Sequence, residues 1–177
     1  EKFTIKSGEN DIIVVPEEKI EITKKLNPIL FYSMIQEAKP IINMNYLEKL
    51  KKEKIDFSYF KDFIKDTKRM IKINENFIEL DKLDKEKYSS ENNIYSLILR
   101  LRGTFIINLL LKKEKYSKRK FKSFLVKNLN IDYDKIYKIY RIARDNKKQK
   151  EKVEIEQAES LLGLLVQDTE KLEKRLK

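Results

Sequence analysis

The side chains that could do chemistry in this chain are carboxylates and basic residues, because it contains no histidine and no cysteine. The commonest general base and transition-metal ligand are therefore missing, and Ser/His/Asp and Cys/His catalytic sets are excluded. Any bound metal must be a hard cation such as Mg²⁺, held by Asp and Glu. A Gly-rich phosphate loop is also excluded, because the three glycines, Gly8, Gly103 and Gly163, lie far apart.

Asp11 is the candidate catalytic carboxylate. It begins the apolar run DIIVV, and an Asp at the start of a strand can project to a sheet edge and hold Mg²⁺. The alternative is a turn residue that closes a hairpin, and the residues alone favour this alternative. Other neighbouring carboxylates, such as Glu17 and Glu18, are typical of solvated surface charge. No metal site is certain from these patterns.

Basic residues form two runs that could follow a phosphate backbone. The first covers residues 112–122 (KKEKYSKRKFK) and includes Lys118 and Arg119, and the second covers residues 147–150. Such runs are more often solvated helix ends, where cations are favoured near the C-terminus. The net charge of +11 has the same two interpretations. A composition biased toward Lys, Ile and Asn explains this basic protein more simply than a dedicated binding surface.

The elements that carry these residues are predicted to be helices. Residues 93–112 are apolar on nearly all sides, which is typical of a helix buried among other helices or in a membrane. A membrane span is disfavoured, because the run is short of about 20 residues and contains Arg100 and Arg102. We predict the central helix of a soluble bundle, with both arginines reaching carboxylates or the surface. Gly103 predicts a close helix crossing.

The helical bundle is assigned to residues 46–177. Helical spacing of apolar residues predicts a short helix at 46–54 and then about five antiparallel helices over residues 58–177. Ser58 is a candidate cap for the first of these five, Tyr116 and Ser117 open the third, and Asp132 or Asp134 opens the fourth. Residues 81–90 are predicted to be a charged connector, and residues 153–176 the last helix.

Residues 1–45 predict a small α/β piece. The runs 3–6 and 11–15 form a β-hairpin, and Asn27-Pro28 begins a helix that Pro40 ends. The segment EEKIEITKKL between them is left unassigned, and residues 41–42 are either a short strand or an apolar linker. An isolated hairpin is not stable. Its free edge must be covered by missing sequence, by another chain or by a homodimer.

Composition indicates the setting. The absence of cysteine points to a reducing, cytoplasmic compartment, and neither a signal peptide nor a membrane segment is predicted. Charged residues make up 39% of the chain and there are only 3 Gly and 3 Pro, a profile that also suits a thermophile. The chain begins with Glu1 rather than Met, and we expect it to be part of something longer.

Three helical stretches carry a family resemblance: IYSLILRLRGTFIINLLLKKEKYSKRKFKSFL, IYKIYRIARDNKK and EIEQAESLLGLL. They resemble the C-terminal half of archaeal-type minimal nucleotidyltransferases of the DNA polymerase β-like superfamily, where a HEPN-like bundle follows the nucleotide-binding domain. DIIVVPEEKI and NPILFYSMIQEAKPI are similar to the last strand and closing helix of that domain. The resemblance implies that residues 1–45 are a remnant of a nucleotidyltransferase-like domain, and that the intact parent uses Mg²⁺.

The chain departs from this family at its catalytic motifs. It lacks the Gly-Ser turn and the Asp-x-Asp pair that bind the triphosphate and two metals. Ser7-Gly8 and Asp11 are either a degenerate remnant of that motif, or Asp11 is the family's third, later carboxylate, which we prefer. Arg144-Asp145 resembles the beginning of the HEPN ribonuclease signature, but residues 149–151 (QKE) occupy the positions of its His. We therefore expect this chain alone neither to transfer nucleotides nor to cleave RNA.

Two function classes follow. In the first, the chain is the C-terminal portion of a nucleotidyltransferase-like protein, inactive alone, whose bundle positions the substrate. In the second, it is a non-catalytic HEPN-like module that binds RNA or a partner protein. The expected ligand is a nucleotide or RNA, with candidate phosphate contacts at Lys118, Arg119, Arg141 and Arg144. For Arg144, pairing with Asp145 or with a Glu on the last helix is the favoured alternative.

Overall fold

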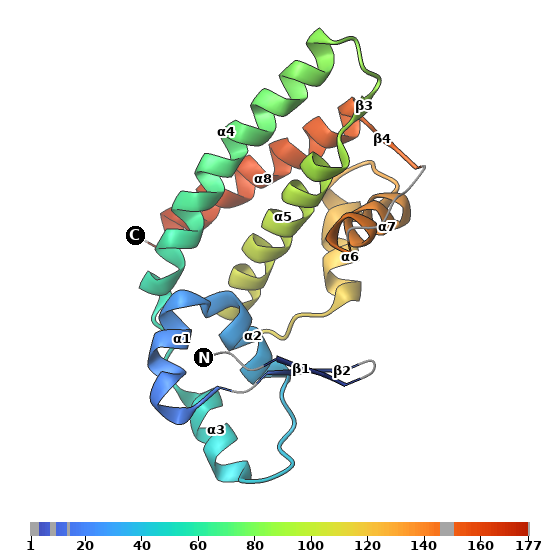
Figure 1. The fold of residues 1–177 in the computed structure, drawn as a ribbon. Helices are drawn as coiled ribbons and strands as arrows, with labels where there is room; N and C mark the ends of the chain where they lie inside the picture. The colour runs from blue at the N-terminus through green and yellow to red at the C-terminus, as the bar shows by residue number, and fades with distance from the viewer. Residues whose placement is uncertain (1–3, 8–9, 14, 146–150, 177) are drawn as a thin grey trace. The chain divides into compact units, whose positions relative to one another are not determined.

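The computed structural model describes residues 4–7, 10–13, 15–145 and 151–176 of the 177-residue chain (Figure 1). Within these residues the fold is mainly helical, with eight α-helices, two short 3-10 helices and two small antiparallel sheets. The chain divides into two compact units, Glu1–Tyr59 and Phe60–Lys177. The sequence predicted this division after residue 45, and residues 46–59 were therefore assigned to the bundle.

The first unit begins with the predicted hairpin. Strands β1 (Thr4–Ser7) and β2 (Asn10–Ile13) pair antiparallel, from Thr4 opposite Ile13 to Ser7 opposite Asn10, and form a sheet of two strands. The 3-10 helix η1 (Glu17–Lys19) and helix α1 (Ile20–Leu26) follow in the segment that the sequence left unassigned. This segment is therefore helical.

Helix α2 (Pro28–Glu37) starts with Pro28 at its first position, as predicted, and packs against α1. Asn27 is its N-cap residue, but the Asn27 side chain makes no capping hydrogen bond. Helix α3 (Met44–Lys52) packs against α2 and therefore belongs to the first unit. Between α2 and α3, residues Ile41 and Ile42 form no strand and are 98% and 87% exposed, so the linker alternative is correct.

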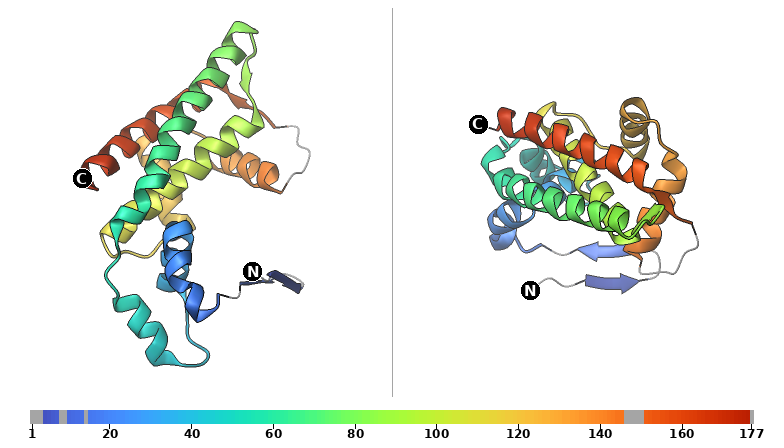
Figure 2. Two further views of the ribbon diagram at one scale, coloured as in Figure 1. Left: turned by 60° about the vertical axis from the view of Figure 1, so that its left-hand side comes forward. Right: turned by 90° about the horizontal axis from the view of Figure 1, so that it is seen from above.

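The second unit is the helical bundle. It contains α4 (Lys61–Leu83), α5 (Glu91–Leu111), α6 (Lys118–Asn128), α7 (Tyr133–Arg144) and α8 (Ile155–Arg175), and it is preceded by the 3-10 helix η2 (Phe57–Phe60). Helix α8 packs against both α4 and α5, and α7 packs against α5 (Figure 2). Strands β3 (Tyr88–Ser89) and β4 (Val153–Glu154), which the sequence did not predict, pair antiparallel just before α5 and α8.

Side-chain caps explain where three of these helices begin. The hydroxyl of Ser90 accepts a hydrogen bond from the backbone N–H of Asn93, and the hydroxyl of Ser117 does the same for Lys120. The Asp132 carboxylate accepts from the N–H of Lys135, so Asp132 rather than Asp134 caps α7. The predicted cap at Ser58 is wrong, because residues 57–60 form η2 and α4 begins after Phe60.

Helix α5 is the centre of the bundle. Twelve of its residues are buried, Leu101 completely, and the helix packs against α4, α7 and α8. It is long and apolar enough to cross a membrane, and more than half of it is buried inside the bundle, as in the core helix of a soluble protein. The prediction that the run is too short to span was therefore wrong, since α5 has 21 residues.

Gly103 lies where α5 crosses α4. A Cβ atom added at this position would lie 2.3 Å from Cζ of Phe63, so only glycine allows the Phe63 ring to approach this closely. The predicted close crossing is confirmed. Arg100 also behaves as predicted, because its Nη2 lies 2.6 Å from Oδ2 of Asp66 on α4. Arg102 is half-buried, and its guanidinium lies 5.1 Å from the ring centroid of Tyr116.

Candidate nucleic-acid interface

Asp11, the predicted catalytic carboxylate, lies on β2 of the first unit, where its backbone is paired with that of Lys6. Its side chain lies outside the described residues. Within the described residues no group of three or more Asp and Glu side chains is arranged to hold a metal ion. The described part of the chain therefore offers no carboxylate cluster for two-metal chemistry.

The four predicted phosphate contacts lie on α6 and α7. The Nζ atom of Lys118 is 4.8 Å from the ring centroid of Tyr137, a cation–π contact that joins the two helices. Arg119 and Arg141 are exposed. Nε of Arg144 donates to Oδ1 of Asp145 at 2.8 Å, so the favoured structural pairing is confirmed. Lys118 therefore links α6 to α7, Arg119 and Arg141 lie on the surface, and the charge of Arg144 is already balanced by Asp145.

The structure brings a different set of basic residues together. A cleft of about 440 Å³ opens in the second unit between α5, α6 and the C-terminal part of α8. We call it the α5–α8 cleft. The floor of the cleft is apolar and consists of Phe105, Leu109 and Phe124. Its rim is basic and consists of Lys112, Lys171, Lys174 and Arg175, with Asn108 beside them. One carboxylate, that of Asp168, completes the lining.

The floor of the α5–α8 cleft is aromatic. The rings of Phe105 and Phe124 lie 4.9 Å apart, centroid to centroid, and Phe121 is 5.5 Å from Phe105 on the inner side. Phe105 and Phe121 belong to the core, whereas Phe124 is only partly buried. A flat, partly exposed ring in a cleft is a platform on which a nucleobase can stack.

The rim is formed by cations from two helix ends. Lys112 is the C-cap residue of α5, and Lys171, Lys174 and Arg175 lie in the last two turns of α8. Nη1 of Arg175 donates to Oδ1 of Asn108 at 3.1 Å, which fixes the guanidinium beside α5. Within the described residues, the three lysines form no ion pair. Their charge is therefore available to an anion, although helix C-termini also favour cations for structural reasons.

Asp168 is the acid in this otherwise basic cleft. It is 6% exposed, and its Oδ2 atom is buried without a hydrogen-bond partner in the part of the chain that the structure describes. Burial raises the pKa of the Asp168 carboxyl above its usual value, and the nearby Lys171 opposes this effect in part. A buried carboxylate oxygen costs stability unless something donates a hydrogen bond to it.

The sequence contained a signal for Asp168 that was missed. On α8 the residues Leu161, Leu165 and Leu172 are fully buried, and Asp168 falls between them at helical spacing. An acidic residue on the apolar face of a helix departs from the apolar pattern of that face, which makes its position a candidate functional site. Lys171 and Lys174 carried no such signal, because basic residues near the end of a charged helix look like ordinary solvated charge.

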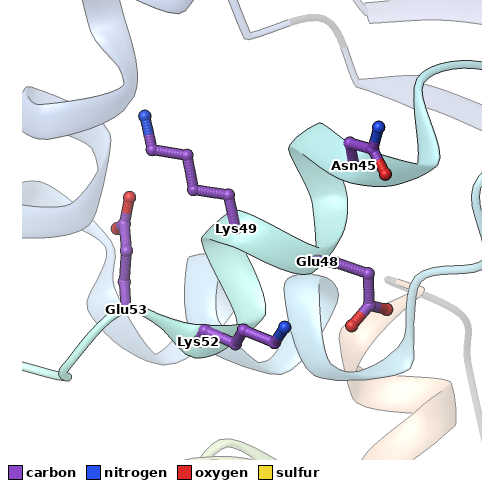
Figure 3. Close-up of a pocket in the computed structure, with 5 residues that line it drawn as sticks. All are labelled: Asn45, Glu48, Lys49, Lys52 and Glu53. Atoms are coloured by element: carbon purple, nitrogen blue, oxygen red, sulfur yellow. The ribbon is translucent and has the colours of Figure 1, made fainter.

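A second depression lies in the first unit and has a volume of about 490 Å³. Its five lining residues, Asn45, Glu48, Lys49, Lys52 and Glu53, all belong to α3 or follow it directly (Figure 3). Glu48 and Glu53 point in different directions in this view, and Oε2 of Glu53 is occupied by Nζ of Lys24 at 2.5 Å. This depression has mixed charge on one helix and no convergent chemistry.

Comparisons with protein-family models, curated proteins and solved structures find no match to this chain. The resemblance to nucleotidyltransferases with a HEPN-like bundle therefore stays a prediction.

Proposed function

We propose that the second unit binds single-stranded RNA, without catalysis, in the α5–α8 cleft. The observation that carries this proposal is the combination of four rim cations with a partly exposed aromatic floor. Proteins that bind single strands combine the same two features, because the cations attract phosphates and the rings stack with bases. Neither feature alone would distinguish a ligand site from a solvated helix end.

The size of the cleft suits one unpaired nucleotide better than a duplex. At about 440 Å³ it falls in the range of sites that enclose one small molecule. An unpaired nucleotide can therefore enter with its base against Phe124, while its phosphates reach Lys171, Lys174 and Arg175. A duplex keeps its bases stacked inside and could offer only its backbone to the rim.

The test compares two sets of charge-removing substitutions in the second unit. The cleft variant carries Lys171→Gln, Lys174→Gln and Arg175→Gln. The matched control carries Lys61→Gln, Lys65→Gln and Lys72→Gln, which remove the same charge from exposed positions on α4 that have no ion pair within the described residues. Binding of a fluorescent oligouridine is measured by anisotropy over a range of salt concentrations.

We expect the cleft variant to bind with much lower affinity than the intact chain. The slope of log Kd against log salt should fall by about 0.7 for each phosphate that the variant no longer neutralises. The control should change affinity only slightly. Equal reductions of affinity in the two variants would mean that net charge, and not the cleft, attracts RNA. In that case the proposal fails.

A second candidate function is supported by the first unit. The hairpin of β1 and β2 forms a sheet of only two strands within the described residues, and helices follow it. This supports the proposal that the chain is the C-terminal portion of a nucleotidyltransferase-like protein, with Mg²⁺ in the intact parent. In such a protein the α5–α8 cleft would hold the RNA acceptor.

The enzymatic candidate is tested by incubating the chain with labelled nucleoside triphosphates, Mg²⁺ and oligouridine. We expect no extension by this chain alone, because the described residues offer no carboxylate cluster to hold two metal ions, and no cleavage, because the chain contains no histidine. Extension that disappears in Asp11→Ala, or cleavage that disappears in Arg144→Ala, would replace the binding function by an enzymatic one.

A further inference from the structure

The α5–α8 cleft contains one group that phosphate binding does not use. Asp168 is an acid, which when ionised repels phosphates, and among the described residues no group donates a hydrogen bond to its Oδ2 atom. The residue is almost completely buried, since its exposed fraction is 6%. Oδ2 has almost no accessible surface, so a ligand in the cleft can donate to this carboxylate only where it faces the cleft, or after it turns toward the cleft that Asp168 lines.

The other polar groups of the cleft limit what that ligand can be. Lys112, Lys171, Lys174 and Arg175 are donors only, and Oδ1 of Asn108 is already occupied by Arg175. A ligand that fits must therefore carry anionic oxygens for the rim, a flat face for Phe124, and a hydrogen-bond donor for Asp168. A ribonucleotide has all three, and its 2′-hydroxyl is the donor that distinguishes it from a deoxyribonucleotide.

We propose that Asp168 accepts a hydrogen bond from the ribose 2′-hydroxyl of a nucleotide bound in the α5–α8 cleft, and so makes the cleft selective for RNA over DNA. This inference rests on the proposed binding function and adds the residue that selects the sugar. The cations supply affinity for either backbone, whereas the carboxylate adds affinity only for the strand that can donate a hydrogen bond to it. Hydrogen bonds to charged acceptors are stronger than neutral ones, which makes a carboxylate suited to this role.

The experiment uses oligouridine and oligodeoxyuridine of equal length, because these two probes differ only in the 2′-hydroxyl. Dissociation constants are measured at one salt concentration for the intact chain, for Asp168→Ala and for Asp168→Asn. The Ala variant removes both acceptors, whereas the Asn variant keeps the shape and one acceptor oxygen. Thermal unfolding of each variant shows that the bundle is folded before binding is compared.

We expect the intact chain to bind oligouridine about tenfold more tightly than oligodeoxyuridine, the effect of one charge-assisted hydrogen bond. Asp168→Ala should abolish this ratio by weakening only the RNA complex, and Asp168→Asn should keep part of it. Binding of the DNA probe should stay the same or become slightly tighter, because an anion has been removed beside the phosphates.

Three results would overturn the inference. In the first, the intact chain binds both probes equally and the cleft variant reduces the affinity for both. In the second, the preference for RNA persists in both Asp168 variants. In the third, Asp168→Ala reduces the affinity for both probes equally, which would place the donor on the base. In each of these cases RNA binding at the cleft still stands. If neither probe binds, or if binding ignores the cleft variant, the proposed function itself has failed.

Discussion

The two units of this chain differ in how far they bury their own apolar residues. In the second unit one hydrophobic cluster joins buried side chains from all five helices, α4 to α8. In the first unit, Phe31 and Tyr32 are the buried apolar side chains of the described residues other than Pro28. Six large apolar side chains of this shorter unit are exposed, against five in the longer second unit; the six are Ile22, Leu26, Leu30, Ile41, Ile42 and Met44.

The units also differ in how they treat a buried charge. Lys24 in the first unit pairs with Glu21 and Glu53 at 2.6 and 2.5 Å, and these two hydrogen bonds outweigh burial and raise its pKa to about 12. Among the described residues, no group donates to Oδ2 of Asp168 in the second unit. A fully paired charge serves the fold, whereas we propose that the unsatisfied one serves a ligand.

Within the described residues, the second unit therefore contains a core of its own, whereas the first buries few apolar side chains. The burial of apolar surface is the main favourable contribution to folding, and a short unit with few buried side chains obtains little of it. The exposed residues of the first unit therefore fit the expectation that more of the same protein, another chain or a second copy covers it.

The largest expected effect comes from separating the units. Residues 60–177 produced alone should unfold cooperatively with nearly the stability of the whole chain, because their core is internal. Residues 1–59 alone should show no cooperative transition. Circular dichroism in urea measures both. A cooperative first unit, or an unfolded second unit, would remove the basis of the comparison.

Within the second unit, the helix at its centre should be the most sensitive to truncation. Leu101→Ala should lower the free energy of unfolding by about 2–5 kcal/mol, because it leaves a cavity in a fully buried site. The exposed Lys87→Ala should change it by less than about 0.5 kcal/mol. Urea denaturation measures both, and small, equal reductions would show that α5 is not the core.

The two glycines of the bundle should respond in opposite directions to alanine. Gly103→Ala should destabilise the bundle by about 1–2 kcal/mol, because the new methyl group overlaps the Phe63 ring. Gly163→Ala should stabilise it by up to about 1 kcal/mol, because among the described residues the new methyl group would meet nothing within 4 Å beyond its own stretch of helix, and alanine is the better helix former. In a Phe63→Leu background the penalty at Gly103 should shrink, whereas the gain at Gly163 should persist.

The smallest expected effect is the pH dependence caused by Asp168. Its pKa is raised in the folded state by burial, so the folded protein binds this proton more tightly than the unfolded chain does. The protonated carboxyl therefore contributes stability at low pH. This contribution is lost as the pH rises from the ordinary pKa of the carboxyl through its raised pKa in the folded state. Asp168→Asn removes this dependence, so the variant should gain on the intact chain as pH rises. A gain that is independent of pH would show that the carboxylate is not desolvated.

Local sequence signals predicted much of the fold. The caps at Ser117 and Asp132, the start of α2 at Pro28 and the crossing at Gly103 each depend on a few neighbouring residues. Helix α1 was not predicted because its buried residue is Lys24, whose partner Glu53 lies far away in the sequence. The pairing of β3 with β4 was missed for a similar reason, since each strand has only two residues and its partner is distant.

The candidate site was harder to predict than the helices. The predicted basic residues on α6 and α7 stood out because they are clustered in sequence. The α5–α8 cleft joins residues from three helices, and only the packing of α8 beside α5 brings Lys112 near Lys171 and Arg175. Periodicity locates the apolar face of each helix, but it does not say which helices will be neighbours.

Mapping the backbone amides that respond to oligouridine tests the central claim most directly. In an NMR titration of the intact chain, we expect shift changes concentrated at residues 108–112 at the end of α5 and 168–175 on α8, with the exposed face of α4 unaffected. The affected amides should saturate together, as they do for one site. Shift changes concentrated instead around Lys118 and Arg141, or in the first unit, would contradict the assignment of RNA binding to the α5–α8 cleft.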